Sequence, residues 1–278
     1  MCEEAGEIQL TEHEQDLQRI RGFRLIDDDF MNACFDGNIE GTELLLRIIL
    51  NEPDLTVSRV ETQKLLKNLA GRDIWLDIDA TSCGKEYNVE IQRADKGAEP
   101  ERARVHSSYL DSHALKPRED YSAIPNSYVI FITENDVLGG GLPIYHVRDT
   151  IEQMNDKEFP DRRHIIYVNG ADQNASTDLG KLMHDFFCTK AVDMNFKVLA
   201  DRVRYFKESD EGVKHMCKVL EDMREETARE QETKTLADTA RNLMETMKWS
   251  FDQTMENMKV PQGQRNAVAG ILHGDCTR

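Results

Sequence analysis

The sequence lacks long apolar runs, paired cysteines and an excess of basic residues, and each absence excludes a class of protein. Its longest apolar runs, residues 44–50 and 128–132, are far shorter than the roughly 20 residues that a membrane span needs, so we expect no membrane association. The six cysteines are scattered and form no CxxC pair, which favours reduced thiols in the cytoplasm over a disulfide framework. The start, MCEEAGEIQL, has no basic segment followed by an apolar one, so no secretory signal is predicted.

The charge balance is strongly acidic, with 35 basic and 52 acidic residues and a formal net charge of −17. This disfavours nucleic-acid binding through bulk charge, although a small basic groove can exist on an acidic body. The eight histidines show no HxxxH, HExxH or HxH spacing, so the sequence does not indicate zinc. Hydrophobic residues make up 39% of the 278 residues, which is enough for one large domain, or for one domain with a helical appendage.

Hydrophobic spacing predicts an α/β core followed by an all-helical extension. Strands are predicted at 55–60, 73–80, 87–92, 126–133, 143–147 and 164–169. Helices are predicted after the aspartates at 27–29, at 99–115, at 177–188 and throughout the chain after 190. We therefore expect a central mixed sheet flanked by helices. The predicted divisions are an acidic, loosely ordered leader (1–20), the core (21–190) and the helical extension (191–278).

The predicted hairpin of DIWLDIDA and YNVEIQ carries the strongest signal for chemistry. Side chains alternate between the faces of a strand, so Asp77, Glu90 and Gln92 meet on one side if both apolar faces point into the core. Facing carboxylates repel one another unless a cation lies between them or one is protonated. Asp77, Glu90 and the backbone carbonyl of Ile91 could together supply the oxygens that Mg²⁺ prefers. Such an ion activates water and neutralises charge on a phosphodiester. The alternative is a hairpin with a solvated, acidic outer face.

Other residues give weaker indications. Glu43 lies in a predicted helix, and a place on the helix surface is its simplest interpretation. The segment 93–118 holds six basic and four acidic residues, so it is locally positive. Arg102 and Arg104 in this segment could hold phosphates, because guanidinium groups suit that geometry. They could equally form surface ion pairs with Glu99, Glu101 and Asp111.

Most of the chain also resembles a known family. The matching stretches are IDDDFMNACF, TELLLRIIL, GRDIWLDIDA, YNVEIQ, ERARVHSSYLDSHAL, EDYSAIPNSYVIFITENDVLGGGLPIY and HIIYVNG, and the tail 251–272 is similar too. In this order they resemble the PD-(D/E)xK nuclease family transposases, relatives of the bacterial recombination-promoting nucleases. The resemblance implies a restriction-endonuclease-like core and a DNA endonuclease that uses Mg²⁺, with Mn²⁺ as a substitute, in the bacterial cytoplasm.

The resemblance also assigns roles to individual residues. Asp77 matches the first acid of the motif and Glu90 the second, while Gln92 stands where the wider superfamily has lysine. Leu76 replaces the motif's proline, and Gln92 leaves the electrostatic role of the lysine unfilled. An amide can still orient a water or a phosphate oxygen.

Three functional hypotheses remain open at this point. The first is a metal-dependent DNA endonuclease, for which a homodimer would supply the two sites of a double-strand cut. The second is a catalytically degenerate nuclease-fold protein that acts as a binding or regulatory module; the net charge, Gln92 and the charged helix after Val213 favour it. The third is action on another phosphoester such as RNA.

Overall fold

The structure, a computed structural model, describes residues 10–67, 73–94 and 97–274. The chain forms two compact units, residues 1–216 and 217–278. The first unit extends beyond the predicted core boundary at 190, because helix α6 (Lys197–Glu208) packs against α2 (Asp28–Phe35). Of the predicted leader, residues 1–9 lie outside the described residues, whereas α1 (Glu12–Gly22) starts at a capping box formed by Thr11 and Glu14.

Within the described residues, six strands form one mixed sheet in the spatial order β1, β2, β3, β4, β8, β5. The strands are β1 (Arg59–Leu66), β2 (Ile74–Ser82), β3 (Lys85–Gln92), β4 (Ser127–Thr133), β5 (Ile144–Val147) and β8 (Arg163–Asn169). β1, β2 and β3 pair antiparallel, β3, β4 and β8 pair parallel, and β5 is antiparallel to β8. The short strands β6 (Thr150–Ile151) and β7 (Lys157–Glu158) pair separately. The predicted central mixed sheet is confirmed.

The hairpin of β2 and β3 turns at Cys83 and Gly84, whose φ angles are 46° and 75°. Two consecutive positive φ angles are typical of the two-residue turns that match strand twist. The predicted hairpin is confirmed.

The strand predicted at 55–60 is wrong, because β1 begins only at Arg59. Leu55 and Val57 are buried in the connection before it. The Val57 N–H donates to the Glu43 carboxylate (2.9 Å) instead of joining a strand ladder. Glu43 also accepts from Arg47 (3.0 Å). Glu43 therefore anchors the connection to its own helix, α3 (Ile39–Leu50).

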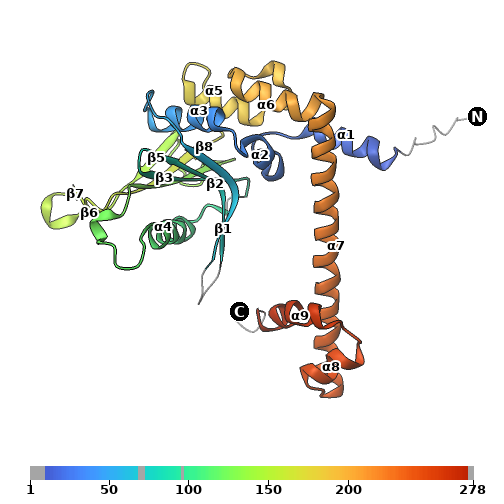
Figure 1. The fold of residues 1–278 in the computed structure, drawn as a ribbon. Helices are drawn as coiled ribbons and strands as arrows, with labels where there is room; N and C mark the ends of the chain where they lie inside the picture. The colour runs from blue at the N-terminus through green and yellow to red at the C-terminus, as the bar shows by residue number, and fades with distance from the viewer. Residues whose placement is uncertain (1–9, 68–72, 95–96, 275–278) are drawn as a thin grey trace, which may run out of the picture. The chain divides into compact units, whose positions relative to one another are not determined.

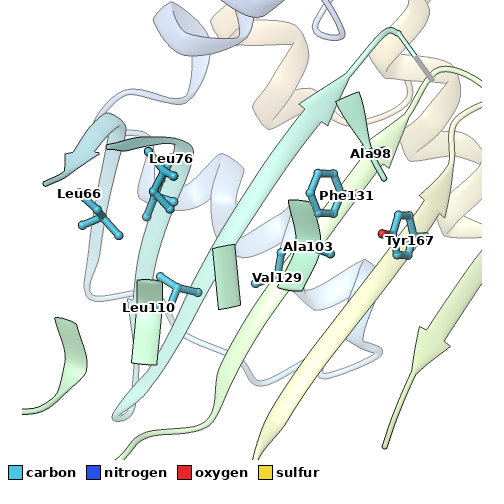
Figure 2. Packing of buried hydrophobic residues seen from close by; sticks show 9 residues of the cluster. Leu66, Leu76, Ala98, Ala103, Leu110, Val129, Phe131 and Tyr167 are labelled. Carbon is cyan, nitrogen blue, oxygen red and sulfur yellow. The ribbon is translucent and has the colours of Figure 1, made fainter. Parts of the chain in front are cut away.

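Helices cover both faces of the sheet (Figure 1). Helix α4 (Pro100–Ala114) lies on one face, whereas α2, α3, α5 (Asp178–Phe187) and α6 lie on the other. Short 3₁₀ turns are η2 (Tyr121–Ala123), η3 (Glu152–Met154) and η4 (Ala191–Asp193). The core beneath α4 joins side chains of β1, β2, β4, β8, α4 and the segment just before α4 (Figure 2): Leu66, Ile74, Leu76, Ala98, Ala103, Leu110, Val129, Phe131 and Tyr167. This packing fixes α4 over β4 and β8.

The second unit is helical. Helix α7 (Asp210–Met247) runs into it, followed by α8 (Phe251–Asn257) and α9 (Gln262–Gly274). Its small core contains Ala237, Ala240, Met255, Val260 and Val268. The predicted helical end of the chain is confirmed. Among the described residues, no helix has the length and apolar character to cross a membrane.

Candidate active site

The ladder between β2 and β3 ends at the pair Ile78 and Val89, and two carboxylates lie just beyond it. The Ile91 N–H of β3 donates to Asp77 Oδ2 (2.9 Å), and the Asp77 N–H of β2 donates to Glu90 Oε1 (3.2 Å). Each carboxylate thus accepts a backbone N–H from the opposite strand. This reciprocal pairing holds Asp77 and Glu90 side by side, as the sequence predicts.

Both carboxylates are buried, which makes the alternative of a solvated acidic outer face wrong. Glu90 is 0% exposed and Asp77 is 8% exposed. Asp79, two residues further along β2, is also 0% exposed, and it pairs with Lys64 (2.6 Å) and Arg59 (2.7 Å) of β1. Helices on both faces of the sheet remove these positions from solvent.

Glu90 is surrounded by hydrogen-bond donors. Its Oε1 accepts from Asn88 Nδ2 (2.7 Å), and its Oε2 accepts from the Arg102 guanidinium (3.1 Å). The Arg102 Nε–H donates to His106 Nε2 (3.3 Å), so His106 carries its proton on Nδ1. That nitrogen lies 3.1 Å from Asn88 Oδ1 and 3.4 Å from Glu90 Oε1. One turn of α4 therefore orients Glu90 through Arg102 and His106.

The local electrostatics disfavour several ionised acids at this place. Burial, reinforced by repulsion from Glu90, raises the pKa of Asp77 to about 8, and the hydrogen bond from Ile91 only partly opposes this. Burial also raises the pKa of Asp28, at the start of α2, and repulsion from Asp29 and Glu90 adds to it. A cation would offset this repulsion.

The donor set fits a hard divalent cation such as Mg²⁺. The Asp77 and Glu90 carboxylates lie beside one another, each held by a backbone N–H of the opposite strand. The set is not a complete cage, because Asp28, Asp77 and Glu90 do not all come within 4.8 Å of one another in the described structure. Mg²⁺ commonly uses one or two carboxylates and keeps several waters, so two protein carboxylates are sufficient.

The other predicted site residues are placed differently. Gln92 ends β3, and its amide lies so close to Gly97 that a methyl group at position 97 would overlap it. Arg102 contacts Glu90 instead of forming the surface pairs considered as an alternative. Arg104 is exposed, and two residues along a helix rotate it about 200° away from Arg102. The structure therefore brings together Asp77, Glu90 and Arg102, but not Arg104.

Sequence reasoning missed three residues of this site. Asn88 lies two residues before Glu90 and shares its strand face, and His106 lies four residues after Arg102 and shares its helix face. Both spacings were visible in the predicted elements. Asp28 had no such signal, because only the tertiary fold brings the start of α2 near the hairpin.

Comparison of the chain with protein-family models, with curated proteins and with solved structures found no match. The family resemblance of the sequence therefore stays a prediction.

Proposed function

We propose that this protein is a metal-dependent DNA endonuclease of the PD-(D/E)xK type, which hydrolyses phosphodiester bonds. The observation that carries the proposal is the reciprocal pairing of two buried carboxylates, Asp77 and Glu90, at the end of the β2–β3 ladder. Two buried carboxylates fixed in this way repel one another, and a divalent cation bound to both would compensate their charges.

Asp77, Glu90 and the backbone carbonyl of Ile91 would hold Mg²⁺, with Mn²⁺ as a substitute. The bound ion would activate a water and neutralise charge on the phosphodiester. In the overall reaction the water oxygen bonds to phosphorus, one P–O ester bond breaks, and the leaving oxygen receives a proton. Gln92 would orient the water or a phosphate oxygen through its amide.

Arg102 has a double role in this proposal. Its guanidinium lies on Glu90 and is 38% exposed, so it is accessible to a phosphate from solvent. On DNA binding it would transfer from Glu90 to the backbone phosphate and free Glu90 Oε2 for the ion. Arg104, on another side of α4, would contact a more distant phosphate.

Cleavage of supercoiled plasmid tests the proposal, with Mg²⁺, Mn²⁺ or EDTA, beside Asp77→Ala and Glu90→Ala. We expect nicking that needs the metal and disappears in both variants. A parallel reaction with structured RNA separates DNA from RNA as the substrate. Absence of cleavage of either nucleic acid, together with no metal binding by calorimetry, would reject the enzyme.

A second candidate is a nuclease-fold protein without catalysis that acts as a binding or regulatory module. One contact favours it: Arg102 already neutralises Glu90 in the structure. This candidate predicts no Mg²⁺ binding and a protein partner, whereas the endonuclease predicts DNA binding that weakens with salt. Residence in the cytoplasm and a homodimer that cuts both strands belong to the first proposal, and sedimentation with and without DNA tests the dimer.

A further inference from the structure

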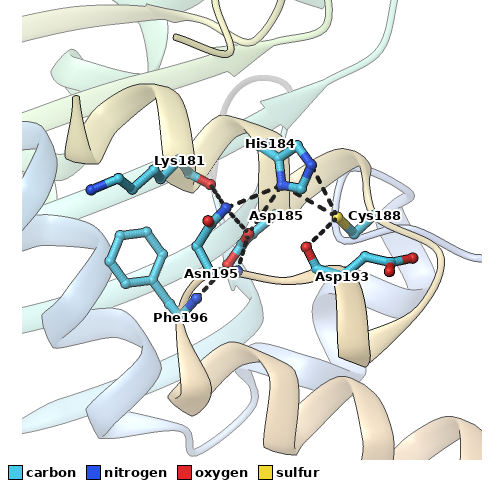
Figure 3. A network of polar contacts seen from close by, with 7 residues as sticks. All are labelled: Lys181, His184, Asp185, Cys188, Asp193, Asn195 and Phe196. Atoms are coloured by element: carbon cyan, nitrogen blue, oxygen red, sulfur yellow. Dashed lines mark hydrogen bonds and ion pairs between the residues drawn. The ribbon is translucent and has the colours of Figure 1, made fainter. Parts of the chain in front are cut away.

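A second group of polar side chains lies at the end of α5, in the first unit (Figure 3). His184, Asp185 and Cys188 each present a potential metal ligand, and the three ligand atoms lie within 4.8 Å of one another. His184 Nδ1 is 3.5 Å from Cys188 Sγ and 3.4 Å from Asp185 Oδ1. Among the described residues, this is the group of three whose ligand atoms come that close together.

These separations match those between ligands of one tetrahedral ion. With Zn–S of about 2.3 Å, Zn–N of about 2.0–2.1 Å and tetrahedral angles, sulfur and nitrogen lie about 3.6 Å apart. The corresponding nitrogen and oxygen ligands lie about 3.4 Å apart. Both values agree with the distances from His184 Nδ1 to Cys188 and to Asp185. The Cys188 Sγ and Asp185 Oδ1 atoms lie within 4.8 Å of one another, so one ion beside His184 Nδ1 comes within reach of all three atoms.

Asp185 is held rigidly enough to serve as an anchor for the site. Its side chain is fully buried, and its two oxygens accept the N–H groups of Asn195 (2.7 Å) and Phe196 (2.8 Å). These bonds connect the end of α5 to the residues that precede α6. Oδ1 accepts both the Asn195 N–H (2.7 Å) and the Asn195 Nδ2 (2.9 Å), so it becomes available to a cation when the Asn195 amide turns away.

The surroundings are negative. The negative charges of Asp185 and Asp193 both act on the Cys188 sulfur. The Asp193 carbonyl also lies 3.7 Å from Cys188 Sγ. A bound divalent cation would compensate these charges and stabilise the thiolate.

Asn195 could complete the ligand set. It is exposed, and its Nδ2 lies 3.1 Å from His184 Nδ1 and 2.9 Å from Asp185 Oδ1. His184 Nδ1 accepts a hydrogen bond from this amide, so its lone pair points toward Asn195 and Asp185. A half-turn of the Asn195 amide would place its oxygen, instead of its nitrogen, beside the ion.

We propose that His184 Nδ1, Asp185 Oδ1 and Cys188 Sγ bind Zn²⁺, with the Asn195 amide oxygen or a water as the fourth ligand. Sulfur and imidazole ligands favour Zn²⁺ over Mg²⁺. Binding replaces the thiol proton, which is released to solvent, by a Zn–S bond. With Asn195 as the fourth ligand, the ion would tie the end of α5 to the segment between η4 and α6, and this role is independent of the proposed nuclease activity. The spacing of histidines alone or of cysteines alone does not indicate this site, because its motif, HDxxC, combines His, Asp and Cys.

Titration of the full-length, tag-free, reduced protein with Co²⁺ tests the proposal. Co²⁺ replaces Zn²⁺ and gives a thiolate-to-metal absorption band together with strong tetrahedral bands in the visible range. We expect both in the wild type, loss of the thiolate band in Cys188→Ser, and binding weakened at least about tenfold in His184→Ala. Cys83→Ser, at an exposed free cysteine in the hairpin turn, is the matched control and keeps the full spectrum.

The spectrum separates this site from the acid pair, because Asp77 and Glu90 offer oxygen atoms and no sulfur. Zn²⁺ in stoichiometric amount should raise the thermal unfolding temperature of the wild type and of Asp77→Asn, but not that of Cys188→Ser. Circular dichroism verifies that each variant folds. A wild type without a thiolate band at saturating Co²⁺, or a band that survives in Cys188→Ser, would overturn the proposal.

Discussion

Replacing Asp77 with Asn should change how the stability of the first unit depends on pH. Asn keeps an oxygen that can accept the Ile91 N–H, but it removes the charge that faces Glu90. The pKa of Asp77 is raised in the folded protein from its ordinary 3.8 to about 8. Between these values the folded state binds more protons than the unfolded state, so stability falls as pH rises.

The size of the effect follows from the same shift. One proton contributes at most about 1.4 kcal/mol of unfolding free energy per pH unit. Across the interval from pH 3.8 to about pH 8, the unfolding free energy can therefore fall by at most about 6 kcal/mol. Because Asp77 and Glu90 titrate as a coupled pair, the effect at Asp77 is smaller than this limit. We expect the unfolding free energy of the wild type to fall by at least about 2 kcal/mol between pH 5 and pH 8. Asp77→Asn should lack this loss, so it should be the more stable protein at pH 8.

Urea unfolding in EDTA at pH 5, 6.5 and 8 measures this difference. Trp75 lies on β2, two residues from Asp77. The chain has two tryptophans, so in a Trp249→Phe background the fluorescence of Trp75 alone reports the unfolding of the sheet. Glu61→Gln, at a half-exposed acid on β1, is the matched control and should follow the wild type. If the curves of wild type and Asp77→Asn run parallel across this pH range, the carboxylate is not strained and the electrostatic reasoning fails.

The neighbouring contacts make three more outcomes measurable. Arg102→Ala removes the guanidinium from Glu90, so calorimetry should find Mg²⁺ binding a few-fold tighter. The salt dependence of DNA binding should become shallower, because one phosphate contact is lost. Unchanged Mg²⁺ affinity would show that Arg102 does not compete with the ion for Glu90. Gly97→Ala displaces the Gln92 amide and should lower the cleavage rate at unchanged Mg²⁺ affinity, whereas wild-type rates would show that Gln92 has no role. Phe131→Ala removes a fully buried ring next to His106 and Tyr167 and should cost about 3–5 kcal/mol in urea unfolding.

Local patterns in the sequence were sufficient to predict the hairpin and the sheet. The alternation of residues in β2 and β3 and the glycine at the turn are signals within one short segment. They also placed Asp77 opposite Glu90, because strand periodicity determines which residues share a face. Helix periodicity similarly located α4 and the helical end of the chain.

Properties that depend on distant segments were not predictable in this way. No local pattern indicates that Asp79 is fully buried and that its charge is neutralised by Arg59 and Lys64 of β1. The alternation at 55–60 suggested a strand, but the Glu43 carboxylate takes the Val57 N–H and the strand starts later. The closeness of Asp28 to Asp77 likewise depends on how α2 packs against the sheet.

Magnesium-dependent plasmid cleavage, compared between an Asp77→Asn variant and a matched acid on the same hairpin, tests the central claim most directly. Glu86→Gln is that control, since Glu86 lies four residues before Glu90 on β3 and bonds Thr81 instead of Asp77. The proposal predicts that wild type and Glu86→Gln nick the plasmid with Mg²⁺ and not with EDTA, and that Asp77→Asn does not nick it. Equal cleavage by Asp77→Asn, or no Mg²⁺-dependent cleavage by the wild type, would contradict it.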